Sequence, residues 1–236
     1  MLGDKVTRLI LLPGMDGTSD LFTEFMRAFP EPKHIRALCY PTGASPPYDQ
    51  LQAMVQTMVP ESEPYFLLAE SYSTPLAIQF AATRPPNLKG VILCAGFAAS
   101  PLTGPKRIFA SMFAPLLFHL RIPSAVINHF LIAPNPPASL QVTVRKAIST
   151  VKPAVMTARL RAVLRCDMRQ ALSQVTVPLL YVQATSDKLV PPSCLAEIRR
   201  IRPDIQVAQI DGPHLILQRE PKQSVEAVAK FTRELQ

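Results

Sequence analysis

Short apolar runs of strand length alternate along this chain with segments of helical length. The strand-like runs are 6–12, 34–40, 65–68, 90–95, 177–184 and 205–210. The helical segments that follow them are 22–29, 49–58, 76–82, 193–201 and 223–235. Apolar runs bounded by turn residues are typical of buried strands, and their alternation with helices favours a parallel sheet. The pattern predicts an α/β fold with about six mostly parallel strands flanked by helices.

The stretch 97–166 departs from this alternation, because eight prolines interrupt it. Its helix-like segments are 108–120, 125–132 and 138–151, and Pro115 is expected to break the first of them. We interpret 97–166 as a helical insertion after the strand that ends near Ala95. Residues 1–96 and 167–236 are then predicted to form the α/β core.

Residues 65–82 have the pattern of a buried strand, a sharp turn and a helix. Pro75 falls in the first turn of that helix, where proline is tolerated. The turn reads Ala-Glu-Ser-Tyr-Ser at 69–73, so small residues stand two positions on either side of Ser71. A serine on such a turn holds its Oγ clear of the backbone. Ser71 is therefore a candidate nucleophile, and the alternative is a serine that caps the helix.

Two later loops each carry one residue that completes a catalytic set. Asp187 lies in Ser-Asp-Lys-Leu-Val-Pro-Pro at 186–192, and His214 ends Asp-Gly-Pro-His at 211–214. Both loops follow predicted parallel strands, as Ser71 does, so the three side chains are expected at one edge of the sheet. An Asp in a turn or a His after a strand is more often structural when it occurs alone. Together, in the order Ser, Asp, His, they predict a nucleophile, an acid and a base.

These motifs resemble the nucleophile elbow, acid loop and histidine loop of the α/β-hydrolase superfamily, which has the same chain order. The resemblance implies that His214 is the general base for Ser71, that Asp187 orients it, and that no cofactor or metal takes part. The insertion 97–166 stands where this superfamily carries a helical cap. The chain departs from the usual G-x-S-x-G, because neither flanking position is glycine.

The same resemblance assigns the oxyanion-hole N–H groups to Met15 and Tyr72. Tyr72 follows the elbow serine, and Met15 follows Pro-Gly at 13–14, where the superfamily often has His-Gly. A backbone donor does not depend on its side chain, so proline is acceptable there. Asp16 is expected to be a turn or capping residue, and Glu70 is expected to face solvent or a local partner.

Large apolar residues within 108–120 outnumber what one short helix can bury. We interpret part of this surface as an acyl-chain pocket, and the alternative is the core of the insertion. The predicted substrate-binding residues are Phe109, Met112, Phe113 and Leu117. The expected reaction is hydrolysis of small to medium acyl esters, a serine carboxylesterase activity. An acyltransferase using the same triad and a non-catalytic binding protein on the same fold remain open.

The charge of the chain is concentrated in the insertion. Residues 97–166 hold nine Lys or Arg and no Asp or Glu, whereas the other 166 residues hold 16 basic and 17 acidic ones. This basic segment could dock an acidic carrier protein, rest on an anionic lipid surface, or simply be a solvated face. The loop 13–18 and the basic insertion are also similar to the pimeloyl carrier-protein methyl ester carboxylesterases. That resemblance implies an acyl-carrier-protein methyl ester as substrate.

Several other classes of function find no support in the sequence. There is no P-loop, no G-x-G-x-x-G, no zinc-ligand spacing and no nucleic-acid recognition motif. No apolar run is long enough to span a membrane, and no signal peptide is visible. Cys39, Cys94, Cys166 and Cys194 are expected to be buried free thiols. We therefore expect a cytoplasmic location.

Overall fold

The computed structural model describes residues 8–120 and 123–235, and its centre is a single sheet of six strands. In spatial order the strands are β2-β1-β3-β4-β5-β6. Their bounds are Arg8–Leu12 (β1), Ile35–Ala37 (β2), Tyr65–Glu70 (β3), Leu88–Cys94 (β4), Leu179–Ala184 (β5) and Gln206–Ile210 (β6). Every pairing is parallel, so the predicted fold class is confirmed. Residues 6–7 of the first predicted strand lie outside the described residues.

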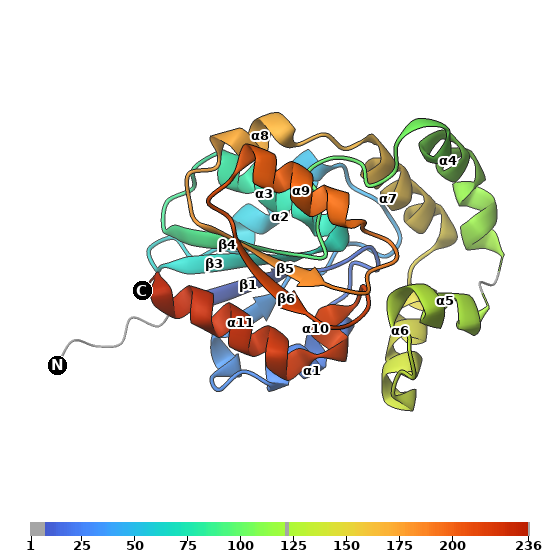
Figure 1. Ribbon diagram of the computed structural model, residues 1–236, viewed down its shortest axis with the longest axis horizontal. Coiled ribbons are helices and arrows are strands. Elements are labelled where there is room, and N and C mark those ends of the chain that lie inside the picture. The colour runs from blue at the N-terminus through green and yellow to red at the C-terminus, as the bar shows by residue number, and fades with distance from the viewer. Residues whose placement is uncertain (1–7, 121–122, 236) are drawn as a thin grey trace.

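Helices cover both faces of this sheet (Figure 1). One face carries α2 (Tyr48–Met58), α3 (Thr74–Ala82), α8 (Arg169–Gln174) and α9 (Pro192–Ile201). The other carries α1 (Thr23–Arg27), α10 (Ile216–Arg219) and α11 (Pro221–Glu234). Alternate strand residues divide between the two layers: Ile10 and Leu12 pack with α2 and α3, whereas Leu9 and Leu11 pack with α1 and α11. Helices α8 and α10 are short and were not predicted.

The insertion forms four helices at the end of the molecule opposite the two chain termini (Figure 1). They are α4 (Gly104–His119), α5 (Ser124–Leu131), α6 (Ala138–Thr150) and α7 (Pro153–Arg165). Helix α7 was not predicted. All four lie in sequence between β4 and β5, and we call residues 97–166 the cap segment. The carboxyl ends of the strands point toward this segment, so the loops that follow them face it.

The expectation that Pro115 breaks its helix is wrong, because α4 continues through it. Proline has no N–H to donate to the carbonyl four residues earlier, which here belongs to Ser111. Arg161 of α7 supplies a replacement, with Nε donating to the Ser111 carbonyl oxygen at 3.4 Å. A neighbouring helix therefore satisfies the carbonyl that the proline leaves without an intrahelical partner.

Two further expectations from the sequence concern membranes and thiols. Within the described residues, no helix combines the length and apolar character needed to cross a bilayer. Cys94, Cys166 and Cys194 are buried free thiols as predicted, but Cys39 is exposed, so that part of the prediction is wrong. Cys39 lies beyond the end of β2, which stops at Ala37, so the sheet does not cover it.

Candidate active site

Ser71 stands on a strained turn between β3 and α3. Its φ of 47° lies in the left-handed region, which costs a non-glycine residue about 1–2 kcal/mol. Residues Ser71–Ser73 form a single 3₁₀ turn, and α3 begins directly after it with Pro75 in the first turn. The strand-turn-helix pattern expected around this serine is therefore present.

The two residues that replace the usual elbow glycines are both buried, and one of them makes hydrogen bonds. Ala69 is fully buried between the layers. Ser73 donates from Oγ to the Pro13 carbonyl oxygen, and the Tyr40 hydroxyl lies 2.6 Å from the same Oγ. Glycine could make neither contact. Ser73 thus ties the elbow to the loop after β1.

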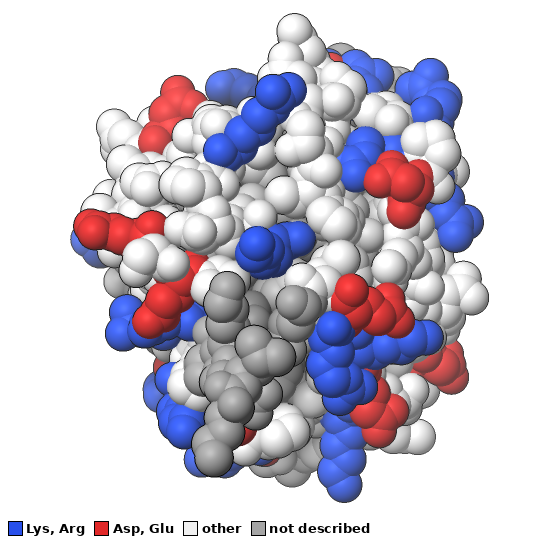
Figure 2. All heavy atoms as spheres, turned by 90° about the vertical axis from the view of Figure 1, so that its left-hand side faces the viewer, with Lys and Arg blue, Asp and Glu red and all other residues white. Residues whose placement is uncertain are grey.

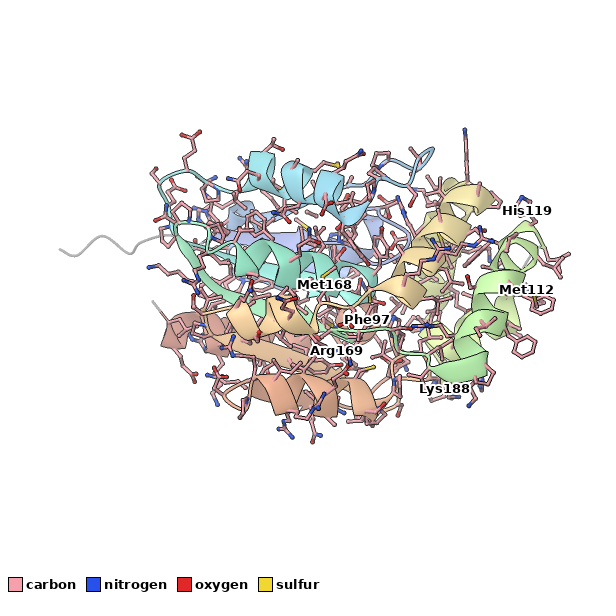
Figure 3. All side chains as sticks on the ribbon, turned by 90° about the horizontal axis from the view of Figure 1, so that it is seen from above. Phe97, Met112, His119, Met168, Arg169 and Lys188 are labelled. Atoms are coloured by element: carbon pink, nitrogen blue, oxygen red, sulfur yellow. The ribbon has the colours of Figure 1, made fainter. Side chains whose placement is uncertain are left out.

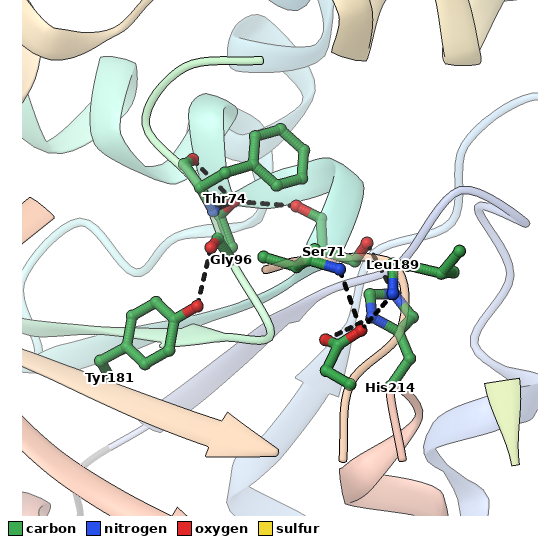
Figure 4. Close-up of polar contacts among 9 residues, drawn as sticks. Ser71, Thr74, Gly96, Tyr181, Leu189 and His214 are labelled. Carbon is green, nitrogen blue, oxygen red and sulfur yellow. Dashed lines mark hydrogen bonds and ion pairs between the residues drawn. The ribbon is translucent and has the colours of Figure 1, made fainter. Parts of the chain in front are cut away.

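Thr74 fixes the elbow from the other side. Its Oγ1 donates to the Ser71 carbonyl oxygen at 2.8 Å and accepts from the Phe97 N–H at 3.1 Å (Figure 4). Gly96 is needed beside it, because a Cβ there would stand 2.6 Å from Thr74 Cγ2. The Gly96 carbonyl in turn accepts from the Tyr181 hydroxyl at 2.8 Å. Thr74 therefore links the Ser71 backbone to the loop that follows β4, and Gly96 of that loop links it to Tyr181 of β5.

The structure brings Ser71, Asp187 and His214 together at the carboxyl edge of the sheet (Figure 4). His214 Nε2 lies 3.0 Å from Ser71 Oγ, and His214 Nδ1 lies 2.8 Å from Asp187 Oδ2. Asp187 Oδ1 accepts backbone N–H groups from Leu189 at 2.8 Å and Val190 at 2.9 Å. The loop after β5 therefore holds the carboxylate while its other oxygen faces the imidazole.

The charge state of His214 is set by opposing effects. Burial lowers the pKa of the imidazole, because it disfavours the charged form. The hydrogen bond and negative charge of Asp187, with a smaller contribution from Glu70, outweigh burial, so the net pKa is raised above its ordinary value. A histidine in this environment accepts a proton from Ser71 more readily than a free imidazole does.

Met15 and Tyr72, the two expected oxyanion donors, lie in the loop after β1 and at the start of the turn after β3. Asp16, next to Met15, has the predicted turn role: its Oδ2 accepts from Thr18 N at 2.9 Å and from Thr18 Oγ1 at 2.6 Å. Gly17 has a φ of 71°, which completes the turn. The donor role of the two N–H groups stays a prediction.

A buried arginine from the cap segment holds this loop, and sequence reasoning missed it. Arg159 of α7 is 1% exposed. Its Nη1 donates to the carbonyl oxygens of Met15 and Asp16, both at 2.8 Å, and its Nη2 donates to that of Pro41 at 2.9 Å. The guanidinium also lies 5.7 Å from the ring centre of Tyr40. In the sequence Arg159 was indistinguishable from the other basic residues of the cap segment.

Glu70 is also buried, so the expectation that it faces solvent is wrong and the expectation of a local partner holds. It is 1% exposed, and Gln218 Nε2 donates to its Oε2 at 3.2 Å. Burial, reinforced by the charge of Asp16, raises the pKa of Glu70 to about 7. Its Oε1 has no hydrogen-bond partner among the described residues, which favours a neutral carboxyl. Nothing in the local sequence distinguishes this acid from an exposed one.

The cap segment also contacts the histidine loop. Leu215, next to His214, donates its backbone N–H to the Leu131 carbonyl oxygen at 3.0 Å. Leu215 also joins a small apolar cluster with Ile132 and Val144. On the other side of the site, Met15 packs against a buried cluster that contains Met156 of α7, and Phe118 of α4 packs against the same cluster. The cap segment thus touches both the oxyanion loop and the histidine loop.

The four predicted substrate-binding residues lie elsewhere. Phe109, Met112, Phe113 and Leu117 are between 46% and 57% exposed on the outward face of α4. Figure 3 shows Met112 on the outer edge of the cap segment. Their role in substrate binding stays a prediction. The cap-segment side chains that Met15 packs against belong instead to the cluster of Val151, Val155 and Met156.

Across 8–120 and 123–235, no three His, Cys, Asp or Glu side chains are grouped so that they could hold a metal ion.

A sequence model of a known family matches most of this chain. The family is described as serine aminopeptidase, S33, and the match covers residues 45–212. The matched segment contains Ser71 and Asp187, the whole cap segment and the strands from β3 to β6. The chain belongs to this family of α/β-hydrolases. The resemblance drawn from the three motifs is thereby confirmed at the level of the superfamily.

Solved structures of other α/β-hydrolases share the fold at low sequence identity. A lipase-esterase related protein from Clostridium acetobutylicum superposes with a TM-score of 0.78 at 16% identity, covering 97% of this chain and 95% of that one. A bromoperoxidase from Bacillus anthracis gives 0.78 at 15% identity, with 96% and 92% covered. The enol-lactonase from Burkholderia xenovorans gives 0.75 at 16% identity, with 96% and 91% covered. The different names of these three show that the shared fold does not fix the reaction.

One curated relative matches over a short stretch. The 2-(acetamidomethylene)succinate hydrolase of Mesorhizobium japonicum is 36% identical over 69 residues, which is 29% of this chain. The match spans only a quarter of that relative's length. The family match over 45–212 makes the chain an α/β-hydrolase, and this short match to one relative adds nothing about its substrate.

Proposed function

We propose that this hydrolase is a serine carboxylesterase that cleaves small to medium acyl esters through an acyl-enzyme on Ser71. The observation that carries the proposal is the position of His214, within hydrogen-bonding distance of both Ser71 Oγ and Asp187 Oδ2. Those two contacts supply a nucleophile, a base and an orienting acid in one line. In this proposal the cap segment, 97–166, covers the site, and residues 1–96 and 167–236 form the α/β core of the protein.

The reaction follows from these contacts. Ser71 Oγ attacks the ester carbonyl carbon while His214 Nε2 takes its proton, and Asp187 stabilises the imidazolium. The N–H groups of Met15 and Tyr72 bind the oxyanion of the tetrahedral intermediate. His214 then protonates the leaving alcohol, which leaves an acyl group on Ser71. Water, deprotonated by His214, cleaves the acyl-enzyme and restores the free serine.

The apolar side chains beside Met15 bear on the size of the acyl group that the site can take. Met15 and Phe118 both pack against a small buried apolar cluster of the cap segment, formed by Val151, Val155 and Met156. Such a wall accommodates a short hydrocarbon chain and offers no charge to a polar acyl group. A methyl ester on an acidic carrier protein differs from a free small ester, because methanol is its leaving alcohol and its acyl chain is tethered to the carrier at the far end.

The decisive experiment is the substitution Ser71→Ala, measured with p-nitrophenyl butyrate and with a fluorophosphonate probe. We expect hydrolysis and labelling to be lost, with the far-UV circular dichroism unchanged. Ser149→Ala is the matched control, because Ser149 is an exposed serine on α6 that bonds only its own helix, at the Lys146 carbonyl. Undiminished hydrolysis in Ser71→Ala would exclude the proposal.

The rival functions give different outcomes in the same assays. A non-catalytic binding protein on this fold would show neither hydrolysis nor labelling before any substitution. An acyltransferase would label at Ser71 but would transfer the acyl group to an added alcohol in preference to water. Product analysis by mass spectrometry in the presence of short alcohols separates transfer from hydrolysis. A series of p-nitrophenyl esters from acetate to palmitate then defines the acyl length.

A further inference from the structure

Helix α4 presents a row of large apolar side chains to the outside. Their exposed fractions run from 46% to 66%. The row consists of Ile108, Phe109, Met112, Phe113, Leu116 and Leu117. Their spacing of one, three and four residues places them on one side of the helix. Phe109 and Phe113 stack with ring centres 6.4 Å apart, so the row is a continuous surface.

The orientation of α4 is the reverse of what core packing would favour. The side that faces α7 carries Ser111 and Ala114, whose carbonyl oxygens accept from Arg161 and Thr157. Only one large apolar residue, Phe118, packs on the same side. Small residues allow the two helices to approach closely, while the large side chains remain outside. An apolar row of this size on one helix marks a surface that is covered by something else when the protein acts.

Basic side chains border this row. Lys106 and Arg107 are exposed at the start of α4, and Arg107, Arg161 and Arg165 line a shallow pocket together with Ile108 and Met112. No Asp or Glu occurs anywhere in 97–166 to offset them. By contrast, the opposite end of the molecule carries acidic and basic side chains side by side (Figure 2).

We propose that α4 docks on the surface of an anionic phospholipid bilayer, with its apolar row in the headgroup region and its basic residues against lipid phosphates. A helix with an apolar face flanked by Lys and Arg has the pattern of an interfacial helix, and it lies on the membrane without spanning it. The inference stands on this surface alone and does not depend on the proposed reaction.

Two other occupants of the row fit the charges or the apolar surface less well. A second copy of the chain, paired across a two-fold axis, would cover the apolar row, but it would leave the basic residues around the row without opposite charges from the facing cap segment, because 97–166 holds no Asp or Glu. An acidic protein would satisfy the basic residues, but its docking needs no row of six large apolar side chains. An anionic bilayer satisfies both features at once.

The experiment is co-sedimentation of the purified full-length protein with phosphatidylcholine vesicles, with and without one third phosphatidylglycerol. We expect binding to the anionic vesicles only. The triple variant Phe109→Ser, Met112→Ser, Phe113→Ser should weaken it about tenfold or more, and these exposed positions should leave the fold intact. Val142→Ser is the matched control, because Val142 is an apolar residue of α6 that is 68% exposed and lies off the row.

Charge is tested separately. The double variant Lys106→Glu, Arg107→Glu should weaken vesicle binding. The double variant Lys222→Glu, Lys230→Glu should not, because these exposed lysines are on α11, outside the cap segment. Equal binding to neutral and anionic vesicles, or full binding by the triple variant, would overturn the proposal. A dimer in sedimentation velocity that the triple variant loses, with no vesicle binding, would assign the row to a second copy. Binding to an acidic carrier protein alone would assign it to that partner.

Discussion

The guanidinium of Arg159, on cap helix α7, donates a 2.8 Å hydrogen bond to the carbonyl oxygen of Met15, whose N–H is a proposed oxyanion donor. The same side chain reaches Asp16 and Pro41 on neighbouring turns. A planar guanidinium with fixed donors holds three carbonyls in one geometry, whereas a lysine ammonium is a compact charge whose donors rotate freely. Arg159 is therefore a positioning residue for the oxyanion loop.

Arg159→Lys is expected to lower kcat about tenfold and to change KM by less than about twofold. The substitution disturbs the alignment of the Met15–Asp16 loop, whereas the apolar residues proposed to contact the acyl group are unchanged. The measurement is steady-state hydrolysis of p-nitrophenyl butyrate. Arg161→Lys is the control, since Arg161 is on the same helix and also donates to a carbonyl, that of Ser111. An equal loss in both variants would mean that Arg159 acts only on stability.

Gly17→Ala is expected to reduce the free energy of unfolding by roughly 2–3 kcal/mol and to lower kcat as well. A Cβ at position 17 would stand 2.5 Å from Arg159 Nη1, and the φ of 71° already disfavours alanine. Gly104→Ala separates the two effects, because Gly104 has a φ of 58° but nothing lies within 4 Å of its Cβ position. Urea unfolding of both variants is the test, and identical losses would rule out the clash.

Asp187→Asn is expected to lower the pKa of His214 and to cut kcat by a factor of roughly 10⁴. Burial alone lowers that pKa, and Asp187 is the main influence that raises it, so its removal leaves burial dominant. Because the base must be neutral to act, activity in the native protein falls as the pH drops through the raised pKa. NMR titration of His214 measures the shift directly. Asp211→Asn is the control, because Asp211 lies in the loop after β6 that carries His214. A pKa that does not move in Asp187→Asn would contradict the assignment.

Glu70→Gln is expected to flatten the dependence of stability on pH between about 5 and 7. Burial and the charge of Asp16 raise the pKa of Glu70 from 4.5 to about 7, so the folded protein binds more protons than the unfolded chain in that range. Stability then decreases as the pH rises, by at most about 1.4 kcal/mol per pH unit, and the glutamine removes this loss. Urea unfolding at several pH values tests it, with exposed Glu226→Gln as the control. Parallel curves for Glu70→Gln and the native protein would refute the argument.

The sheet was predictable because each strand is an apolar run between breakers, and the three catalytic candidates follow such runs directly. The cap segment was predictable only in part. Its helices depend on tertiary contacts. At Pro115, for example, Arg161 replaces the missing hydrogen bond, and Arg161 lies on α7, a helix that the sequence pattern did not reveal. Arg159 and Glu70 were missed for a related reason, since only packing decides which charged residues are buried.

The bond between Leu215 and Leu131 and the grip of Arg159 on residues 15–16 attach the cap segment on both sides of the reacting serine. Grafting the helical insertion of another family member onto this core, as an engineer might do to alter substrate choice, would remove both attachments together. Such a chimera would therefore lose turnover at the same time as its substrate selectivity changed. Restoring Arg159 and the backbone segment around Leu131 would be needed to keep the two effects apart.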